Sequence, residues 1–182
     1  FMLLNNKIYF SADASGNDRE LWVTDGTGAG TKMVKDMNPS GSSNFRLDLV
    51  QGNLLYFTLE DATSGRELWV TDGTSAGTKM VKDINSGTDG TSENFAWAIL
   101  GDLIYFQADD GVHGPELWAT DGTEAGTKLI SNVKQGGSHP SEFISFNNKL
   151  FYSANDGVNG GELWVSDGTE AGTKILKDID AG

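Results

Sequence analysis

One stretch of thirteen residues, ELWVTDGTGAGTK from Glu20 to Lys32, places a carboxylate beside threonines and glycines. Oxygens of this kind could bind a metal ion, and a glycine-rich loop could cradle a phosphate. The same pattern also suits a tight turn, in which Asp25 accepts hydrogen bonds from its own loop and Gly26 and Gly30 supply positive φ angles. This cassette returns three times, as ELWVTDGTSAGTK at Glu67, ELWATDGTEAGTK at Glu116 and ELWVSDGTEAGTK at Glu162.

The metal and phosphate interpretations of the cassette both lack groups that such sites need. Ca²⁺ takes about 6 to 8 oxygen ligands, several of them carboxylates, whereas each copy of the loop offers one carboxylate. A phosphate site would need the Lys-Ser/Thr pair of a P-loop or the N-terminus of a helix. The pattern therefore predicts a self-capped turn with no metal and no cofactor. Ca²⁺ bound by the acidic pairs Glu60-Asp61 and Asp109-Asp110 is the alternative that stays open.

Two further residue types recur in every cassette and could also do chemistry. The tryptophans could stack on sugars or bases, but we expect each to pack against the next repeat, because a tryptophan buries a large apolar area. The glutamates could form an acidic catalytic pair, yet four equivalent copies do not make one asymmetric site, and we expect cross-strand ion pairs instead. The predicted structural motif comprises Trp22, Asp25, Trp69, Asp72, Trp118, Asp121, Trp164 and Asp167. The predicted ion pairs join Glu20, Glu67, Glu116 and Glu162 to Lys32, Lys79, Lys128 and Lys174.

The composition argues against several classes of function. A formal net charge of −13 disfavours nucleic acid and anionic membranes, which attract basic patches. The absence of cysteine removes disulfides, thiolate catalysis and thiolate metal sites. No apolar run approaches the roughly 18 residues of a membrane helix, so no membrane insertion is expected. The chain begins at Phe1 without a signal peptide, and we expect a mature or excised piece of a longer protein.

The spacing of the cassettes predicts the architecture. Their glutamates lie 47, 49 and 46 residues apart, so four repeats cover nearly the whole chain. Each repeat shows four short strand-like segments, as at 95–100, 103–108, 116–121 and 127–133. The first two are joined by two-residue turns that are typical of hairpins: Asn5-Asn6, Gly52-Asn53, Gly101-Asp102 and Asn147-Asn148. Runs such as LLYF at 54–57 indicate strands that are buried on both faces.

Small four-stranded sheets buried on both faces, with a period of about 40 to 50 residues, are typical of β-propeller blades. We therefore predict an all-β protein, a β-propeller with four four-stranded antiparallel blades in one repeat domain, 1–182. The blades lie approximately at 1–44, 45–94, 95–142 and 143–182. A β-sandwich is the less favoured alternative. No strand is left over for sharing between the termini, so we expect a closed four-bladed ring or half of an eight-bladed ring in a homodimer, with part of a longer array as a further alternative.

The four copies also separate a constant end of each blade from a variable one. The loops between the third and fourth strands read DGTGAGT, DGTSAGT, DGTEAGT and DGTEAGT. The second-to-third loops and the fourth-to-first connections differ among copies, and up-and-down strands place both opposite the cassette. Varied loops on a constant scaffold are typical of a binding face. The candidate ligand-binding residues are Asp61, Asp110, His113, Asp156 and Asn159, and Asp89, Glu93 and His139 lie on the same face.

The repeated motif resembles the bacterial ELWxxDGT repeat family, whose signature is ELWxxDGTxxGT. The signature is complete at 20–31, 67–78, 116–127 and 162–173, and the repeats around it cover essentially the entire chain. The resemblance implies a secreted or surface-associated bacterial protein built from tandem repeats of the β-propeller type. It implies little about activity, and it brings no catalytic residues to this chain.

These observations favour a non-catalytic propeller module that acts as a binding or interaction scaffold, in an extracellular or cell-surface location. Its partner would be a protein or a glycan, contacted through the variable loops. A purely structural or engineered repeat without a ligand is the first alternative. The second is a fragment of a propeller glycosidase or lyase, which would need two carboxylates at a defined separation.

Overall fold

The computed structural model describes residues 1–13, 19–38, 44–61, 63–92 and 96–179. These residues form four four-stranded antiparallel sheets, each with its strands in sequence order, and contain no helix. The predicted fold class is confirmed in this respect. The chain divides into two compact units, Phe1–Asp89 and Gly90–Gly182, each of which holds two sheets.

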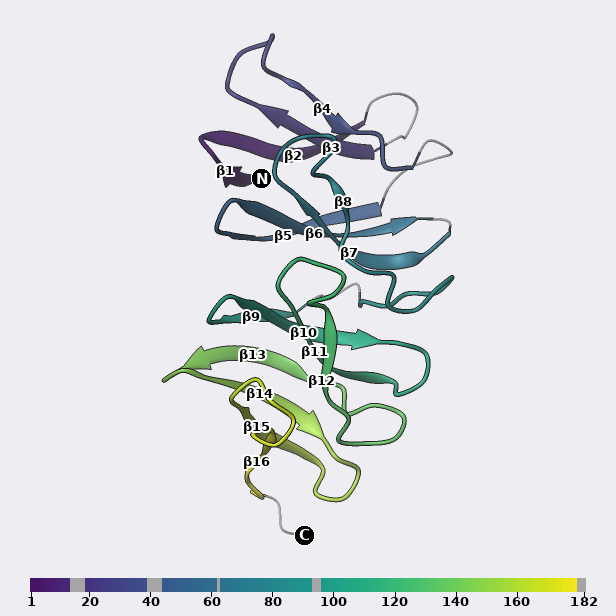
Figure 1. Ribbon diagram of the computed structural model, residues 1–182, viewed down its shortest axis with the longest axis vertical. Coiled ribbons are helices and arrows are strands. Elements are labelled where there is room, and N and C mark those ends of the chain that lie inside the picture. The colour runs from purple at the N-terminus through teal and green to yellow at the C-terminus, as the bar shows by residue number, and fades with distance from the viewer. Residues whose placement is uncertain (14–18, 39–43, 62, 93–95, 180–182) are drawn as a thin grey trace. The chain divides into compact units, whose positions relative to one another are not determined.

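The strands are short and are numbered as in Figure 1. The first sheet comprises β1 (Met2–Leu4), β2 (Lys7–Asp13), β3 (Arg19–Thr24) and β4 (Lys32–Lys35), and the second comprises β5 (Asn44–Gln51), β6 (Leu54–Asp61), β7 (Gly65–Thr71) and β8 (Lys79–Met80). The third comprises β9 (Trp97–Leu100), β10 (Leu103–Asp109), β11 (Pro115–Thr120) and β12 (Lys128–Ser131). The fourth comprises β13 (Ser141–Phe146), β14 (Lys149–Asn155), β15 (Gly161–Ser166) and β16 (Lys174–Lys177).

The turns between the first two strands of each sheet follow from local residue chemistry. Asn5 and Asn6 have φ angles of 50° and 58°, as a type I′ turn requires at both central positions. Asn147 and Asn148 repeat this conformation with 49° and 57°. In the second and third sheets only the glycine of each pair has a positive φ, so these two turns differ from the other two.

Each sheet has two apolar faces, because successive side chains in a strand point to opposite sides. One face, which we call the Tyr face, carries Tyr9, Leu21 and Val23 in the first sheet. The opposite face, the Trp face, carries Ile8, Phe10 and Trp22, joined in register across β2 and β3. Both faces need a cover, which explains why the strands read as continuous apolar runs.

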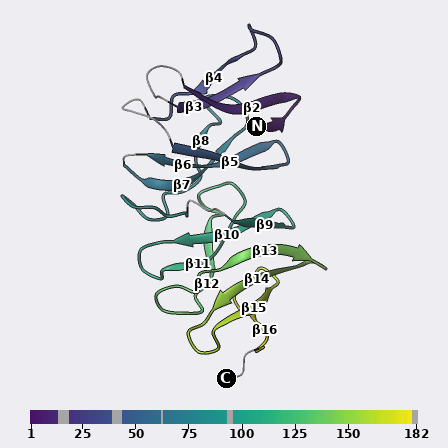
Figure 2. The ribbon, with the colours of Figure 1, turned by 180° about the vertical axis from the view of Figure 1, so that it is seen from behind.

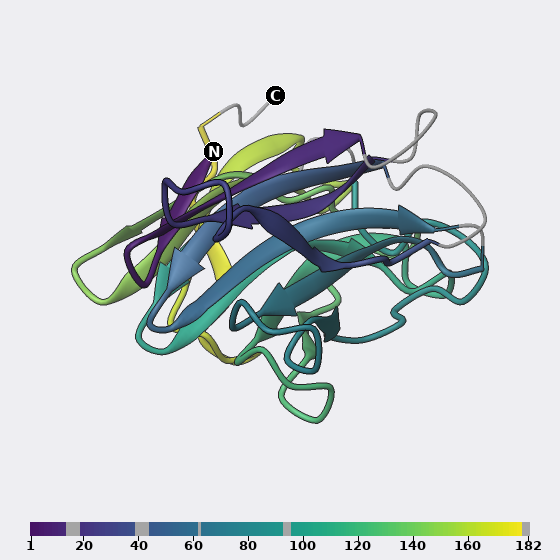
Figure 3. The ribbon, with the colours of Figure 1, turned by 90° about the horizontal axis from the view of Figure 1, so that it is seen from above.

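In the first unit, the Tyr face of the first sheet packs on the Trp face of the second. Tyr9, Leu21 and Val23 share one buried cluster with Phe57 and Trp69. Figures 1 and 2 show these sheets as neighbours, and in the view from above the purple strands of the first sheet overlie the blue strands of the second (Figure 3).

The second unit repeats this packing with the third and fourth sheets. Tyr105 and Leu117 on the Tyr face of the third sheet share a cluster with Leu150, Tyr152 and Trp164 on the Trp face of the fourth. Trp69 and Trp164 therefore pack against the sheet that precedes theirs, and not against the following sheet as predicted from the sequence. The expectation was wrong because strand alternation does not specify which neighbour each face meets.

Candidate functional site

The cassette loop is organised by its own aspartate. Asp25 Oδ1 accepts hydrogen bonds from the backbone N–H of Thr27 (3.0 Å) and from its hydroxyl (2.7 Å). The Thr27 hydroxyl oxygen accepts from Gly30 N at 2.9 Å, and Thr31 Oγ1 donates to the Thr27 carbonyl at 2.7 Å. The same bonds recur in the other three copies. These hydrogen bonds from Thr27 lower the pKa of Asp25, so the loop carries a fixed charge.

The two glycines of this loop, Gly26 and Gly30, have different roles, and only Gly26 meets the expectation. Gly26 has a φ of 91°, as expected, but Gly30 is not among the glycines with positive φ. A Cβ at Gly30 would instead lie 2.0 Å from Asp25 Oδ1, and Gly77, Gly126 and Gly172 meet their own aspartates in the same way. The second glycine is needed because the carboxylate occupies the space of a side chain.

This contact predicts a contrast between two glycines of one loop. Gly30→Ala should destabilise the first unit by about 1–2 kcal/mol, because Asp25 must give up hydrogen bonds to make room. Gly28→Ala is the matched control, since a Cβ there meets nothing within 4 Å and Gly28 has no positive φ. Urea unfolding of both variants measures the difference, and equal midpoints would contradict this role for Gly30.

The glutamate of each cassette is buried and binds backbone N–H groups of the connection that follows the fourth strand. Glu20 Oε2 accepts from Met37 N at 3.1 Å, and Glu162 Oε2 accepts from Ile179 N at 3.1 Å. Glu67 Oε1 accepts from Asn85 N at 3.2 Å. The predicted ion pairs between these glutamates and the cassette lysines are wrong in all four copies, because each lysine lies opposite an apolar residue of the third strand. The pairs in register are Lys32 with Val23, Lys79 with Val70, Lys128 with Ala119 and Lys174 with Val165.

In the third copy this contact between the cassette glutamate and the following connection, which we call the tether, is made by Glu116. Its carboxylate accepts from Lys134 N (3.3 Å), Ser138 N (3.1 Å) and the Ser138 hydroxyl (2.6 Å). Burial raises the pKa of Glu116, and the hydrogen bonds offset only part of this effect. The glutamate of the ELW motif thus fixes the position of a fourth-to-first connection.

The aspartates predicted to bind a ligand are engaged within their own loops. Asp61 Oδ1 accepts from Thr63 N and Ser64 N, both at 2.7 Å. Asp110 Oδ1 accepts from Val112 N (3.0 Å) and His113 N (2.9 Å). Burial alone would raise the pKa of each carboxyl. The hydrogen bonds outweigh burial, so the pKa of Asp61 and that of Asp110 are both lowered.

The second carboxylate oxygen, Oδ2, of Asp110 and of Asp156 also has a side-chain partner. Asp110 Oδ2 lies 2.7 Å from His113 Nδ1. Asp156 Oδ2 accepts from Asn159 Nδ2 at 2.8 Å, and its Oδ1 accepts from Val158 N and Asn159 N. The structure therefore brings His113 to Asp110 and Asn159 to Asp156 as equivalent caps of two loops. Both pairs stabilise the structure of their own loop. The sequence does not show this equivalence, because His113 and Asn159 are different residue types.

The second-to-third loops and the fourth-to-first connections lie against one another in each unit. Arg66 N donates to Asp89 Oδ1 at 2.7 Å, and His139 N donates to the Pro115 carbonyl at 3.0 Å. A Cβ at Gly114 would lie 2.4 Å from the carbonyl carbon of Gly136. We call the described part of these loops in the second unit, 110–114, 134–139 and 156–160, the variable rim. Glu93 lies outside the described residues.

Two valines at the tips of the variable rim are exposed. Val112 is 76% exposed and Val158 is 86% exposed, at equivalent positions in the third and fourth sheets. Beside them lie the capped side chains of His113 and Asn159, which are partly buried. The rim thus offers apolar contacts on loops that hydrogen bonds hold in place.

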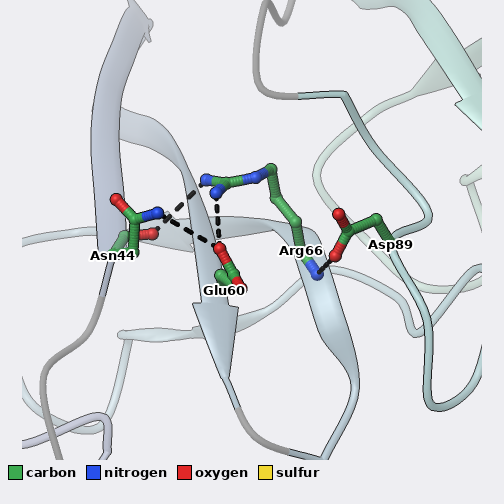
Figure 4. Close-up of polar contacts among 4 residues, drawn as sticks. All are labelled: Asn44, Glu60, Arg66 and Asp89. Carbon is green, nitrogen blue, oxygen red and sulfur yellow. Dashed lines mark hydrogen bonds and ion pairs between the residues drawn. The ribbon is translucent and has the colours of Figure 1, made fainter.

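The second sheet carries a polar cluster of which the first sheet has only the equivalent ion pair, Arg19 with Asp13 at 3.7 Å. Arg66 is buried and donates from Nη2 to Glu60 Oε2 at 2.6 Å and from Nη1 to the Asn44 carbonyl at 3.4 Å (Figure 4). Asn44 Nδ2 donates to the same Glu60 oxygen at 3.1 Å. The register of β5, β6 and β7 places these three residues side by side, next to Arg46 and Thr58.

Asp48 also belongs to this cluster. It lies at a register shift in β5, its side chain is fully buried, and its Oδ2 accepts from Thr58 N at 2.8 Å. Arg46 Nε lies 3.3 Å from Oδ1. Burial raises the pKa of Asp48 to about 6, against the opposing effect of Arg46. Such a group could exchange a proton near neutral pH, but it is closed to solvent.

This cluster was not among the predicted sites, although the sequence carries a signal for it. Arg46 and Asp48 interrupt the first strand of the second copy, whereas the corresponding strands elsewhere read WAIL at 97–100 and FISF at 143–146. Arg66 corresponds to Arg19 of the first copy, whereas the later copies have Pro115 and Gly161 at this position. Charge inside a strand that is apolar in sister repeats was therefore the available indication.

Two general properties of the described residues bear on function. They hold no group of three or more His, Cys, Asp or Glu side chains that could bind a metal ion. Within 1–13, 19–38, 44–61, 63–92 and 96–179, no helix has the length and apolarity needed to cross a membrane.

Comparison with known proteins supports the fold. No protein-family model and no curated protein matches the chain. Among solved structures, the chain is similar to TolB from Acinetobacter baumannii, with a TM-score of 0.50 and 13% identity, over 89% of this chain and 38% of that one. An α-L-arabinofuranosidase from Clostridium thermocellum ATCC 27405 is also similar, with a TM-score of 0.37 and 12% identity, over 94% of this chain and 69% of that one. The latter similarity is too low to carry an argument. The likeness to TolB, together with the four four-stranded sheets, shows a fold of the β-propeller type.

Proposed function

We propose that this chain is a non-catalytic propeller repeat module that binds a protein or glycan partner through the variable rim, in an extracellular or cell-surface setting. The observation that carries the proposal is the pair of exposed valines, Val112 and Val158, on loops capped by Asp110 and Asp156. Exposed apolar side chains on ordered loops lose little conformational entropy when a partner covers them.

The proposal moves the contact from the aspartates first considered to the residues that they position. Asp110 and Asp156 each accept two backbone hydrogen bonds. A ligand that replaced these backbone N–H donors at the carboxylates would have to disrupt the loop. Their role in binding is to hold Val112 and Val158 outward. His113 and Asn159 border the same surface and can contact a partner through their remaining edges.

The test is a binding screen of the chain against a glycan array and a displayed peptide library. We expect the double variant Val112→Asp, Val158→Asp to weaken binding to any hit at least tenfold, because burying each valine contributes roughly 1.5 kcal/mol. Glu124→Ser and Glu170→Ser, in the cassette loops, are controls that should leave binding unchanged.

Two outcomes would contradict the proposal. Binding that survives the double valine variant and is lost in the cassette variants would place the contact on the constant loops. A chain that binds no member of either set would favour the purely structural alternative.

A carboxylate-based hydrolase is the second candidate function, and Asp48 and Glu60 are the observation that favours it. They lie in one polar cluster, where Asp48 has a raised pKa and Glu60 is partly exposed, and glycoside hydrolysis uses a pair of carboxyl groups. The burial of Asp48 keeps a substrate away from it and places this function second. Hydrolysis of aryl glycosides by the native chain and not by Asp48→Asn would contradict the non-catalytic proposal.

A further inference from the structure

The first sheet leaves its Trp face exposed, and the fourth sheet leaves its Tyr face exposed. The equivalent face of a sister sheet is covered in each case. Leu21 and Leu117, on the Tyr faces of the first and third sheets, are 0% and 1% exposed, whereas the equivalent Leu163 in the fourth is 40% exposed. On the Trp face, Leu55 and Leu150 are fully buried, but the equivalent Ile8 in the first sheet is 42% exposed.

The Tyr face of the fourth sheet has the chemistry and the shape of a packing surface. Ile144, Phe146, Leu176 and Ile179 are exposed beside Leu163. A hollow of about 330 Å³ is lined by Ile144, Phe151, Leu163 and Ile179, among others. Contiguous exposed apolar side chains of this kind mark a surface that another protein covers.

The Trp face of the first sheet has the matching chemistry. Phe1 and Leu3 are exposed next to Ile8, and Phe1 lies 6.0 Å from Phe10 between ring centroids. In the second sheet, the corresponding face meets a Tyr face within one buried cluster. The structure thus contains the same junction twice, and its two halves are exposed at opposite ends of the sequence.

A polar contact across the junction of the first unit also has a counterpart. Lys35 Nζ, on the first sheet, donates to the carbonyl of Thr78 in the cassette of the second at 2.7 Å. Lys177 occupies the position of Lys35 in the fourth sheet and is exposed, and Thr31 occupies the position of Thr78 in the first cassette. A fourth sheet docked on a first sheet therefore has both the donor and the acceptor of this hydrogen bond.

The match departs from the pattern at one position. The hydroxyls of Tyr9 and Tyr105 approach Gly73 and Gly168 of the following cassettes, where a Cβ would lie 2.0 and 2.2 Å away. The fourth sheet has Phe151 at this position, and a Cβ at Gly26 of the first cassette meets nothing within 4 Å. The new junction would thus keep the apolar packing and the lysine contact without the hydroxyl contact.

We propose that the Tyr face of the fourth sheet binds the Trp face of the first sheet of a second copy of this chain. The contact is head to tail, since two different surfaces meet, and it continues the packing order of the repeats from one chain into the next. Each copy carries a net charge of −13, so the copies repel at long range and added salt should favour their association.

Solution mass tests the proposal, with one variant on each face. We expect a mass of at least twice 19.5 kDa in sedimentation velocity for the native chain, rising in population with salt. Ile144→Lys on the Tyr face and Leu3→Lys on the Trp face should each reduce it to the mass of one chain. Ser75→Lys, at an exposed position of the second cassette loop, adds the same charge on neither of the two faces, and as the matched control it should leave the mass unchanged.

Mixing the two face variants distinguishes this head-to-tail contact from other modes of association. Each variant retains the face that the other has lost, so the mixture should regain assemblies of two chains, which also shows that both variants are folded. A native chain with the mass of one copy at every concentration and salt would overturn the proposal in favour of closure within the chain. Assemblies that resist both variants, or a mixture that fails to associate, would overturn it as well.

Discussion

Replacement of Glu116 by alanine is expected to cost roughly 3–5 kcal/mol of unfolding free energy in the second unit. The glutamate is fully buried and accepts three hydrogen bonds, from Lys134 N, Ser138 N and the Ser138 hydroxyl. Removing the carboxylate leaves three donors without this acceptor in a site where Ser138 is also buried. Each such donor costs about 1–3 kcal/mol when it loses its partner away from water.

Urea unfolding followed by tryptophan fluorescence measures this loss, and amide hydrogen exchange locates it. We expect the largest loss of protection at 134–138, the connection that Glu116 holds. Glu116→Gln keeps one acceptor oxygen and should lose less than Glu116→Ala. Glu124→Ala, an exposed glutamate of the same sheet's cassette, is the control and should stay within about 0.5 kcal/mol of the native chain. Equal stability of Glu116→Ala and Glu124→Ala would refute the tether.

The tether explains where sequence reasoning about the cassette succeeded and where it failed. The sheets and most of the hairpins were predictable because their signals are local: paired asparagines in a turn, apolar runs in strands and a fixed period. The partner of Glu20 was not predictable in this way. In the observed register Lys32 lies opposite Val23 and Lys35 opposite Leu21, with a shift between Leu21 and Trp22, so Glu20 extends past the fourth strand to Met37.

The variable loops show a second limit, which concerns what a difference in sequence means. His113 and Asn159 are different residues, yet each approaches the second carboxylate oxygen of the aspartate three residues before it. The difference in residue type predicts a difference in role, but both side chains complete the same capped turn. The exposure of Val112 and Val158 follows from that turn, and it could be seen only once the loop geometry was known.

Asp48→Asn is expected to stabilise the first unit at pH 7 by about 1–3 kcal/mol. Burial raises the pKa of this carboxyl to about 6 in the folded chain, compared with about 3.9 in an unfolded one. Since one pKa unit corresponds to about 1.4 kcal/mol, the buried charge costs up to about 3 kcal/mol once it is ionised. Asparagine is neutral, has the same shape, and keeps an oxygen that can accept from Thr58 N.

The direction of the pH dependence follows from the raised pKa. Between about pH 4 and pH 6 the folded state holds a proton on Asp48 that the unfolded state has released, so native stability should fall as the pH rises through this window. Asp48→Asn should lose this component of the slope, and the two chains should converge in stability near pH 4. Urea unfolding from pH 4 to pH 7.5 measures both curves, with Asp102→Asn in an exposed turn as the control.

The opposite result would have a definite meaning for the cluster. If Asp48→Asn destabilised the chain at pH 7, the attraction of Arg46 and Arg66 to the Asp48 carboxylate would exceed the cost of its burial. The cluster would then be a net stabilising ion network, and its charges would need no further explanation. If instead the neutral variant is more stable, the second sheet retains a buried charge at a cost in stability that its sister sheets avoid with apolar residues. That cost is typical of functional sites, and it would make the polar cluster the first place to look for a role beyond the scaffold.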